Sequence, residues 1–207
     1  MSHDHKKTHD EIRFPDDMEL LERAIRELLI EKGVFTNEEF LKQMQESEKI
    51  SPADGAKVIA RAWSNSTFKN NLLDNPKLAL AEMGYNVGAP EPNLMVLEQT
   101  EKTHYVVVCT LCSCYPRSLL GPPPDWYKSL EYRSRVVIDP RGVLEEFGTK
   151  INNDVEIKVV DSTADLRYLV IPKKPKGCEN FDEEELSKLV SRDSMIGVTF
   201  AIEPEAV

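Results

Sequence analysis

The sequence predicts an α+β fold, with a helical arm near the N-terminus followed by a mixed α/β domain. Apolar residues recur at helical spacing in the first part of the chain, whereas β-branched runs such as 106–108 appear after residue 90. Strands and helices alternate irregularly in this second part, which favours α+β over a doubly wound sheet. We therefore expect a disordered tail at 1–17, a helical arm at 18–90 and a second domain at 91–207.

The tail is polar throughout. His3, His5 and His9 lie in it, and a flexible polar segment is favoured there over a loose metal site. The tail does not resemble a secretory signal, and no run in the chain approaches the ~18 apolar residues of a membrane span. We therefore predict a cytoplasmic protein that does not associate with membranes.

Four amphipathic helices are predicted in the arm. In the first, leucine, isoleucine and alanine residues form one stripe over 18–32, and Gly33 ends it. The other three begin at residues suited to capping, namely a Thr36–Glu39 capping box, Ser51-Pro52 and Asn75-Pro76. Short amphipathic helices gain most of their stability from packing, so the arm must lie against the rest of the chain or against a partner.

The second domain is expected to contain strands and helices. The strand-like runs are LMVLEQ at 94–99, HYVVVC at 104–109, VEIKVV at 155–160, RYLVIP at 167–172 and MIGVTFAI at 195–202. The expected helices are DWYKSLEYRSRVV at 125–137, a short one from an Asp139 cap to Gly148, and DEEELSKLV at 182–190.

The charge and the cysteines narrow the class of function. The formal net charge is −10 and no basic face is evident, which argues against nucleic acid as a partner. Three of the four cysteines lie in the segment CTLCSC at 109–114, where neighbours this close rarely have disulfide geometry. Clustered cysteines of this kind indicate catalysis or metal binding.

The three cysteines, Cys109, Cys112 and Cys114, do not match the commonest cysteine motifs. A redox pair of the first two leaves Cys114 without a role, and Pro116 disfavours the helix that usually follows such a pair. Zinc and cysteine-ligated iron–sulfur clusters need a fourth ligand, whereas Cys178 and the nearest histidine are isolated in the sequence.

A claw around one metal ion accounts for all three cysteines. The sulfurs of Cys112 and Cys114, with the backbone nitrogens of Ser113 and Cys114, would form chelate rings of six, five and five members. Cys109 can supply an axial sulfur, which leaves a sixth position open. Two thiolates and two amidates favour low-spin trivalent cobalt or iron over zinc.

Such a centre has two chemical consequences. An open position on a trivalent Lewis acid can polarise a bound group, and electron-rich thiolates are readily oxidised to sulfenate or sulfinate. From the residues alone, two interpretations are left: this claw, and a buried or redox-active cysteine cluster. The alternative of another class is a non-catalytic metal carrier or redox sensor.

Several segments resemble one known family. VCTLCSC resembles the metal-binding segment of the nitrile hydratase and thiocyanate hydrolase family, in the metal-bearing subunit. LGPPPDWYKSLEYRSRVVIDPRGVLEEFG, VEIKVVDSTADLRYLVIPKKPKG and EEELSKLVSRDSMIGV resemble the nitrile hydratase α subunit, and the likeness covers nearly the whole chain beyond residue 18. It implies a mixed α/β catalytic domain with α-β-β-α layers.

The resemblance implies a modified metal site. Cys109 would be the axial thiolate, Cys112 a sulfinate and Cys114 a sulfenate, while Ser113 and Cys114 would bind through their amide nitrogens. Thr110 matches the cobalt form, so one low-spin Co(III) ion is expected, with Fe(III) as the second choice and no organic cofactor. Cys114 would be catalytic.

The resemblance also implies partners and a substrate. A β-type subunit would complete a hetero-oligomer, an activator or metallochaperone would load the metal, and Arg167 would support catalysis. The expected reaction is hydration of a nitrile to an amide. After the claw, however, CYPR stands where nitrile hydratases usually have CYPWP, and Arg117 would attract anionic thiocyanate. Thiocyanate hydrolysis by the γ-type subunit is therefore the alternative, while Trp126 and Tyr127 line the substrate pocket or belong to the core.

Overall fold

The computed structural model describes residues 17–85 and 92–204. The three tail histidines and the expected boundary at residue 90 lie outside this range. The chain divides into one compact unit up to Glu46 and another from Ser47 onward, so the helices between residues 52 and 82 belong with the strands. The expected arm, which ended at residue 90, included these helices. Along the described chain, no helix has the length and apolar character needed to cross a membrane.

The first unit contains α1 (Asp17–Glu31) and the start of α2 (Asn37–Lys49). The predicted helix at 18–32 is confirmed, and Gly33 follows it with a φ of +68°. The predicted capping box is also confirmed, since the Thr36 N–H donates to a Glu39 carboxylate oxygen at 2.7 Å and the Glu39 N–H donates to the Thr36 hydroxyl at 3.1 Å. None of the α1 residues is buried.

In the second unit, the described residues before the strands form three helices after the end of α2. They are α3 (Pro52–Ser64), α4 (Ser66–Asp74) and α5 (Pro76–Glu82). The predicted starts of α3 and α5 are confirmed, because proline occupies the first turn of both. Helix α4 was not predicted from the sequence. Its N-cap is Asn65, whose side-chain oxygen accepts from the Phe68 N–H at 2.9 Å.

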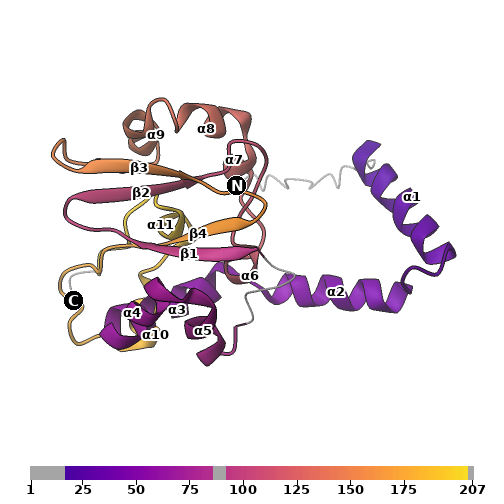
Figure 1. The fold of residues 1–207 in the computed structure, drawn as a ribbon, viewed down its shortest axis with the longest axis horizontal. Coiled ribbons are helices and arrows are strands. Elements are labelled where there is room, and N and C mark those ends of the chain that lie inside the picture. The colour runs from indigo at the N-terminus through magenta and orange to yellow at the C-terminus, as the bar shows by residue number, and fades with distance from the viewer. Residues whose placement is uncertain (1–16, 86–91, 205–207) are drawn as a thin grey trace, which may run out of the picture. The chain divides into compact units, whose positions relative to one another are not determined.

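Within residues 92–204, four strands form two small parallel sheets. Strand β1 (Asn93–Glu98) pairs with β4 (Leu166–Ile171), and β2 (Thr103–Val108) pairs with β3 (Glu156–Asp161). These four predicted strands are confirmed. Figure 1 shows the two sheets next to each other, with β2 and β3 nearer to α8 and α9 and β1 nearer to α4 and α5. Helices and small parallel sheets together make a mixed α/β domain.

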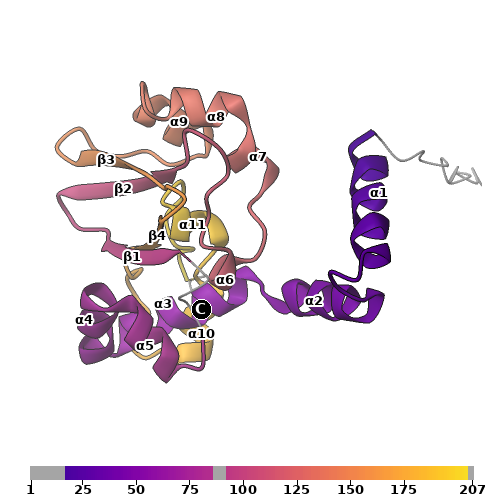
Figure 2. The ribbon, with the colours of Figure 1, turned by 45° about the vertical axis from the view of Figure 1, so that its right-hand side comes forward.

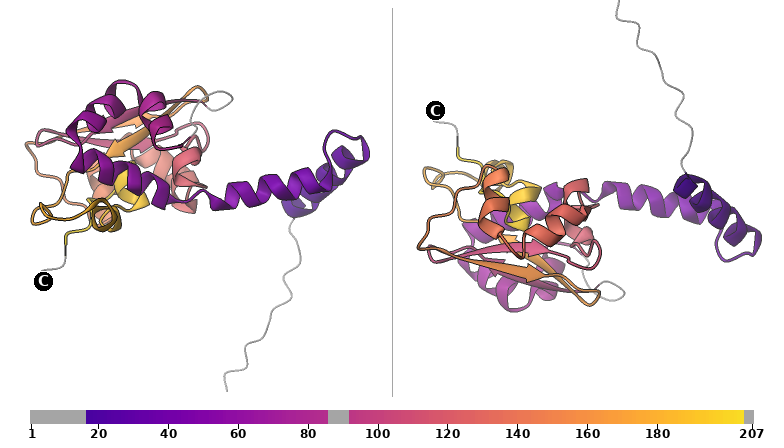
Figure 3. Two further views of the ribbon diagram at one scale, coloured as in Figure 1. Left: turned by 90° about the horizontal axis from the view of Figure 1, so that it is seen from below. Right: turned by 90° about the horizontal axis from the view of Figure 1, so that it is seen from above.

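The described part of this unit contains six further helices, which surround the strands. They are α6 (Arg117–Leu120), α7 (Asp125–Lys128), α8 (Leu130–Arg135), α9 (Pro140–Glu146), α10 (Glu183–Lys188) and α11 (Arg192–Ile196). Figure 2 shows α10 beside α3 and α11 behind the strands. In Figure 3, the view from below has the purple helices α3 to α5 in front, and the view from above has α8 and α9 in front. Helices therefore cover the strands from both sides.

Two expectations for this domain are wrong. The helix expected over 125–137 is split into α7 and α8 because Ser129, with a ψ of 140°, has extended backbone and caps the second helix. The strand expected over 195–202 does not form. Residues 195 and 196 instead end α11, which starts at a Ser191–Ser194 capping box, and Gly197 in left-handed conformation ends the helix. Part of this run is buried without forming a strand, since Val198 is 0 % exposed, whereas Phe200 and Ile202 are exposed.

Substitution of Gly197 should strongly destabilise the fold. Its φ is +85°, and an added Cβ would lie 2.0 Å from the Tyr105 carbonyl oxygen. We expect Gly197→Ala to lower the free energy of unfolding by roughly 3 kcal/mol or more. Gly33→Ala is the matched control, because its φ of +68° carries similar strain but nothing lies within 4 Å, so it should cost about 1 kcal/mol. Urea unfolding measures both; equal losses would contradict the role of the steric contact.

The stability of the fold should also depend on pH through His104, which is 4 % exposed and whose Nε2 lies 2.7 Å from the Gly197 carbonyl oxygen. Burial lowers the pKa of His104; the hydrogen bond to Gly197 opposes this shift and the charge of Lys173 adds to it. Below about pH 6.5 the unfolded chain binds the proton first, so stability is lost as pH falls toward the folded pKa. We expect the difference in unfolding free energy between wild type and His104→Gln to shrink between pH 8 and 5.5. A constant difference would contradict this.

Candidate metal centre

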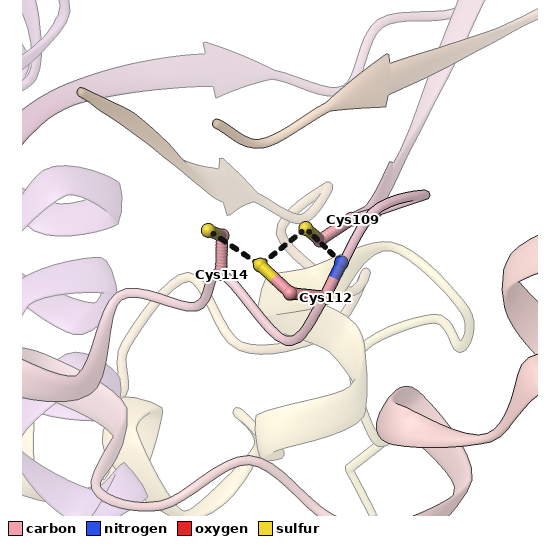
Figure 4. Close-up of side chains that lie close together, drawn as sticks. All are labelled: Cys109, Cys112 and Cys114. Carbon is pink, nitrogen blue, oxygen red and sulfur yellow. Dashed lines mark hydrogen bonds between the residues drawn. The ribbon is translucent and has the colours of Figure 1, made fainter. Parts of the chain in front are cut away.

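The cysteine loop begins where β2 ends. Val108 pairs with Asp161 in the parallel register, so the loop after β2 and the turn after β3 leave the same edge of the sheet. The Cys112 sulfur lies 3.4 Å from the Cys109 sulfur and 3.2 Å from the Cys114 sulfur. Figure 4 shows the three side chains pointing toward one another, with the Cys112 N–H donating to the Cys109 sulfur at 3.3 Å. Local chain geometry thus gathers three thiols at one point.

One side of the loop is open. Cys109 and Cys114 are buried, whereas Cys112 is exposed and the side chain of Leu111 is 88 % exposed. Ser113 is exposed as well. The thiol cluster therefore has a protein side and an outward side.

A carboxylate from β3 holds the start of the loop. The Thr110 N–H donates to one oxygen of Asp161 at 3.0 Å, and the Thr110 hydroxyl donates to the other at 2.6 Å. The Ser162 N–H donates to the Val108 carbonyl oxygen at 2.7 Å and extends the β2–β3 pairing by one bond. Asp161 therefore fixes Thr110, the residue that directly follows the first cysteine.

Side chains from α7 and α8 bind carbonyl groups in and next to the loop. The Tyr127 hydroxyl donates to the Cys114 carbonyl at 2.8 Å, and the Tyr132 hydroxyl donates to the Val107 carbonyl at 2.8 Å. Arg133 Nη1 donates to the Cys112 carbonyl at 3.1 Å. The loop is thus held through its backbone, which leaves the thiols free to face one another.

The pKa values of the Cys112 and Cys114 thiols are shifted in opposite directions. Hydrogen bonds from the Cys114 and Cys109 thiols, followed by the N–H groups of Cys114 and Ser113, lower the pKa of Cys112. Burial, with the neighbouring thiols, raises the pKa of Cys114 to about 12, and the positive charge of Arg167 acts in the opposite direction. A metal ion would displace these protons, because a coordinated thiol is deprotonated.

The donor set fits a metal that prefers sulfur. The ligand atoms of Cys109, Cys112 and Cys114 lie within 4.8 Å of one another. The N–H groups of Ser113 and Cys114 face the Cys112 sulfur, so both peptide nitrogens of the expected claw lie beside the thiols. Cys178 is not part of this cluster; its buried thiol donates to the Pro175 carbonyl oxygen at 2.9 Å.

Comparison with known proteins identifies the family. The family model described as nitrile hydratase, alpha chain, matches residues 16–199. The chain belongs to this family. It is 48 % identical to the α subunit of the high-molecular-weight cobalt-containing nitrile hydratase of Rhodococcus rhodochrous, over 89 % of this chain and 92 % of that subunit.

Two other family members show the breadth of the likeness. The thiocyanate hydrolase γ subunit of Thiobacillus thioparus is 40 % identical over 88 % of this chain and 79 % of that subunit. A double mutant of the Fe-type nitrile hydratase from Comamonas testosteroni Ni1 has a TM-score of 0.85 and 36 % identity, and the match covers 93 % of this chain and 95 % of that chain.

The remaining residues that the sequence predicted for the site of this nitrile hydratase family member lie in different parts of the structure. Arg167 is close enough to Cys114 to influence its pKa, and its buried Nη1 has no hydrogen-bond partner in the described part of the chain. Tyr127 is fully buried and contacts the loop backbone, whereas Trp126 packs edge-on against Tyr127 and two other rings, Tyr132 and Phe147. Arg117 is exposed at the start of α6.

The contacts that hold the loop were not predicted from the sequence. Asp161 lies at the end of a predicted strand, and nothing in the pattern there indicates that it binds Thr110. Tyr132 and Arg133 had no predicted contact with the loop either. They lie 25 and 21 residues from their partners in sequence, and no periodicity or spacing indicates such long-range contacts to a backbone carbonyl.

Proposed function

We propose that this chain is the metal-bearing subunit of a cobalt nitrile hydratase and takes part in the hydration of nitriles to amides. The observation that carries the proposal is the three-thiol cluster at the end of β2, with two peptide N–H groups beside it. Cobalt is favoured because the relative at 48 % identity is cobalt-containing, and the Fe-type structure makes iron the second choice.

The thiols would hold the metal with the nitrogens of Ser113 and Cys114. The bound ion would supply a Lewis acid that polarises the nitrile. Oxidised to a sulfenate, Cys114 would offer an oxygen that attacks the nitrile carbon or activates water for that attack. The exposed Cys112 would become the more highly oxidised sulfinate, since susceptibility to oxidation rises with exposure. Arg167 would place a positive charge beside the Cys114 oxygen.

We further propose that a β-type subunit covers this chain. Leu111 beside the thiols is 88 % exposed, which places one apolar side chain at the surface next to the proposed site. In the first unit, a groove of about 390 Å³ between α1 and α2 is lined mostly by apolar residues: Met18, Leu21, Ile25, Leu29, Phe35 and Phe40. Both surfaces suit an apolar protein partner in a hetero-oligomer. An activator would load the metal before or during assembly.

Thiocyanate hydrolysis is the second candidate function. Arg117 follows the claw closely, and a positive charge there favours an anionic substrate over a neutral nitrile. The 40 % identity to a thiocyanate hydrolase γ subunit supports this alternative. A metal carrier or redox sensor is the third, and it would release its metal to mild chelators.

Mass spectrometry and substrate assays test these functions. We expect the chain, co-produced with its β-type subunit, to hold about one cobalt, and its claw peptide to carry two oxygens on Cys112 and one on Cys114. Nitrile hydration should exceed thiocyanate hydrolysis. Arg117→Gln should then change nitrile turnover little, whereas for a thiocyanate hydrolase it should lower kcat/KM several-fold, because the lost charge is exposed. Unmodified thiols with zinc or no metal would contradict both catalytic functions.

Two structural expectations complete the proposal. We propose that the second unit is layered α-β-β-α, with support from the helices on both sides of the strands in Figure 1. We also propose a location in the cytoplasm, where reducing conditions keep the thiols available until the metal binds.

A further inference from the structure

Arg133 makes an unusual contact with the cysteine loop. It lies on α8, and its Nη1 donates to the Cys112 carbonyl oxygen at 3.1 Å. Its Nε is buried and has no hydrogen-bond partner within the described residues. Arg135 on the same helix is different, since it pairs with the carboxylates of Glu131 and Glu146. The guanidinium of Arg133 is thus directed at one backbone carbonyl.

That carbonyl belongs to the peptide whose nitrogen is the expected ligand. The Cys112 carbonyl and the Ser113 nitrogen form one amide, so they share their π electrons. When a metal–nitrogen bond replaces the N–H bond of Ser113, the proton leaves to solvent and the amide becomes anionic. Resonance moves part of this negative charge onto the Cys112 oxygen. A positively charged hydrogen-bond donor to that oxygen then contributes more stabilisation than it does before metal binding.

The loop offers an internal comparison. The Cys114 carbonyl accepts from the neutral hydroxyl of Tyr127, and this carbonyl shares its amide with the nitrogen of Tyr115, which is not an expected ligand. The charged donor therefore contacts the carbonyl of one of the two ligating peptides, and the neutral donor contacts that of a peptide outside the claw.

We propose that Arg133 is a positioning residue that stabilises the anionic Ser113 peptide and thereby favours retention of the metal in the claw. This inference rests on the proposed function, because it requires the amide nitrogen of Ser113 to bind the metal. Arg133 touches neither substrate nor sulfur in this role. It acts through the Cys112 carbonyl alone.

Three variants separate charge from packing. Arg133→Gln keeps a hydrogen-bond donor but loses the charge, Arg133→Lys keeps the charge, and Arg135→Gln removes the same charge from the same helix away from the loop. Each chain is co-produced with the β-type subunit and loaded with cobalt in the presence of a chelating competitor. Cobalt per chain, the visible absorption spectrum and the urea midpoint are measured.

We expect Arg133→Gln to retain roughly 10- to 100-fold less cobalt than wild type at limiting metal, as for other groups that support metal ligands. Arg133→Lys should retain most of the wild-type amount of cobalt, and Arg135→Gln should retain as much cobalt as wild type. In the Arg133→Gln chains that do hold cobalt, the ligand-to-metal charge-transfer band should move to longer wavelength, because loss of the positive charge raises the energy of the filled peptide orbitals. A purely structural role would lower the urea midpoint without this shift.

The outcomes are distinguishable. If wild type holds cobalt with oxidised cysteines but Arg133→Gln retains cobalt equally well with an unchanged spectrum, this inference is overturned and the proposed function stands. If Arg133→Lys loses as much cobalt as Arg133→Gln, a role for the charge is overturned. If wild type holds no cobalt, both the proposed function and this inference fall.

Discussion

Cys114→Ala should lose cobalt and lower nitrile hydration by roughly 10³-fold or more. The reason is that one side chain has two roles in the proposed site. Its sulfur is one of three thiols that lie within 4.8 Å of one another, and its sulfenate oxygen would be the nucleophile or base. Cobalt content by elemental analysis and the initial rate of amide formation measure the two losses separately.

Cys178→Ala is the matched control for this substitution. Its thiol is also buried, but it lies in a separate apolar cluster with Ala60, Leu186 and Leu189. Cys178→Ala thus also removes a buried cysteine sulfur, but at a position away from the loop. We expect its cobalt content and turnover to be close to those of wild type. A Cys114→Ala protein that keeps cobalt and turns over nitriles would contradict the claw mechanism. Equal losses in both variants would indicate destabilisation instead.

The cluster of three thiols was predictable from the sequence because it is local. Three cysteines within six residues can meet only at one point, and the distances between their sulfurs bear this out. The capping residues were predictable for the same reason, since Thr36 and Glu39 satisfy each other's backbone across one helical turn. Patterns formed by residues three or four positions apart can be recognised in the sequence without knowledge of the tertiary structure.

Two of the features that were missed are local, namely the Asn65 cap of α4 and the extended Ser129 between α7 and α8, whereas two others depend on contacts distant in sequence. The run at 195–202 is as apolar as a strand, but Gly197 packs against the Tyr105 carbonyl in a conformation that interrupts extended backbone. Likewise, the pairing of Val108 with Asp161 brings that carboxylate to Thr110, although 51 residues separate the two side chains. In both regions, tertiary contacts determined the backbone path and the supporting residues.

Arg167→Gln should lower nitrile turnover by about 10²-fold while cobalt content stays near that of wild type. Arg167 lies near the start of β4, where pairing with Leu94 of β1 fixes its backbone. Its positive charge favours the anionic form of the Cys114 sulfur, and its buried Nη1 has no acceptor in the described part of the protein. A preorganised donor of this kind contributes about 10²- to 10³-fold to turnover when it stabilises a developing charge in a site that excludes water.

Two further variants test whether Arg167 acts on the reacting atoms. Arg167→Lys keeps the charge but loses the planar fork, so we expect turnover between that of Arg167→Gln and wild type. Lys158→Gln removes an exposed charge from β3 that pairs with Glu156, and turnover should not change. The same preparations give cobalt per chain and the mass of the claw peptide. If turnover in Arg167→Gln falls only in proportion to lost cobalt or lost oxidation of Cys114, Arg167 supports assembly of the site, and its role beside the sulfenate oxygen is contradicted. A loss of kcat in chains with full cobalt and full oxidation places its effect in the reaction itself.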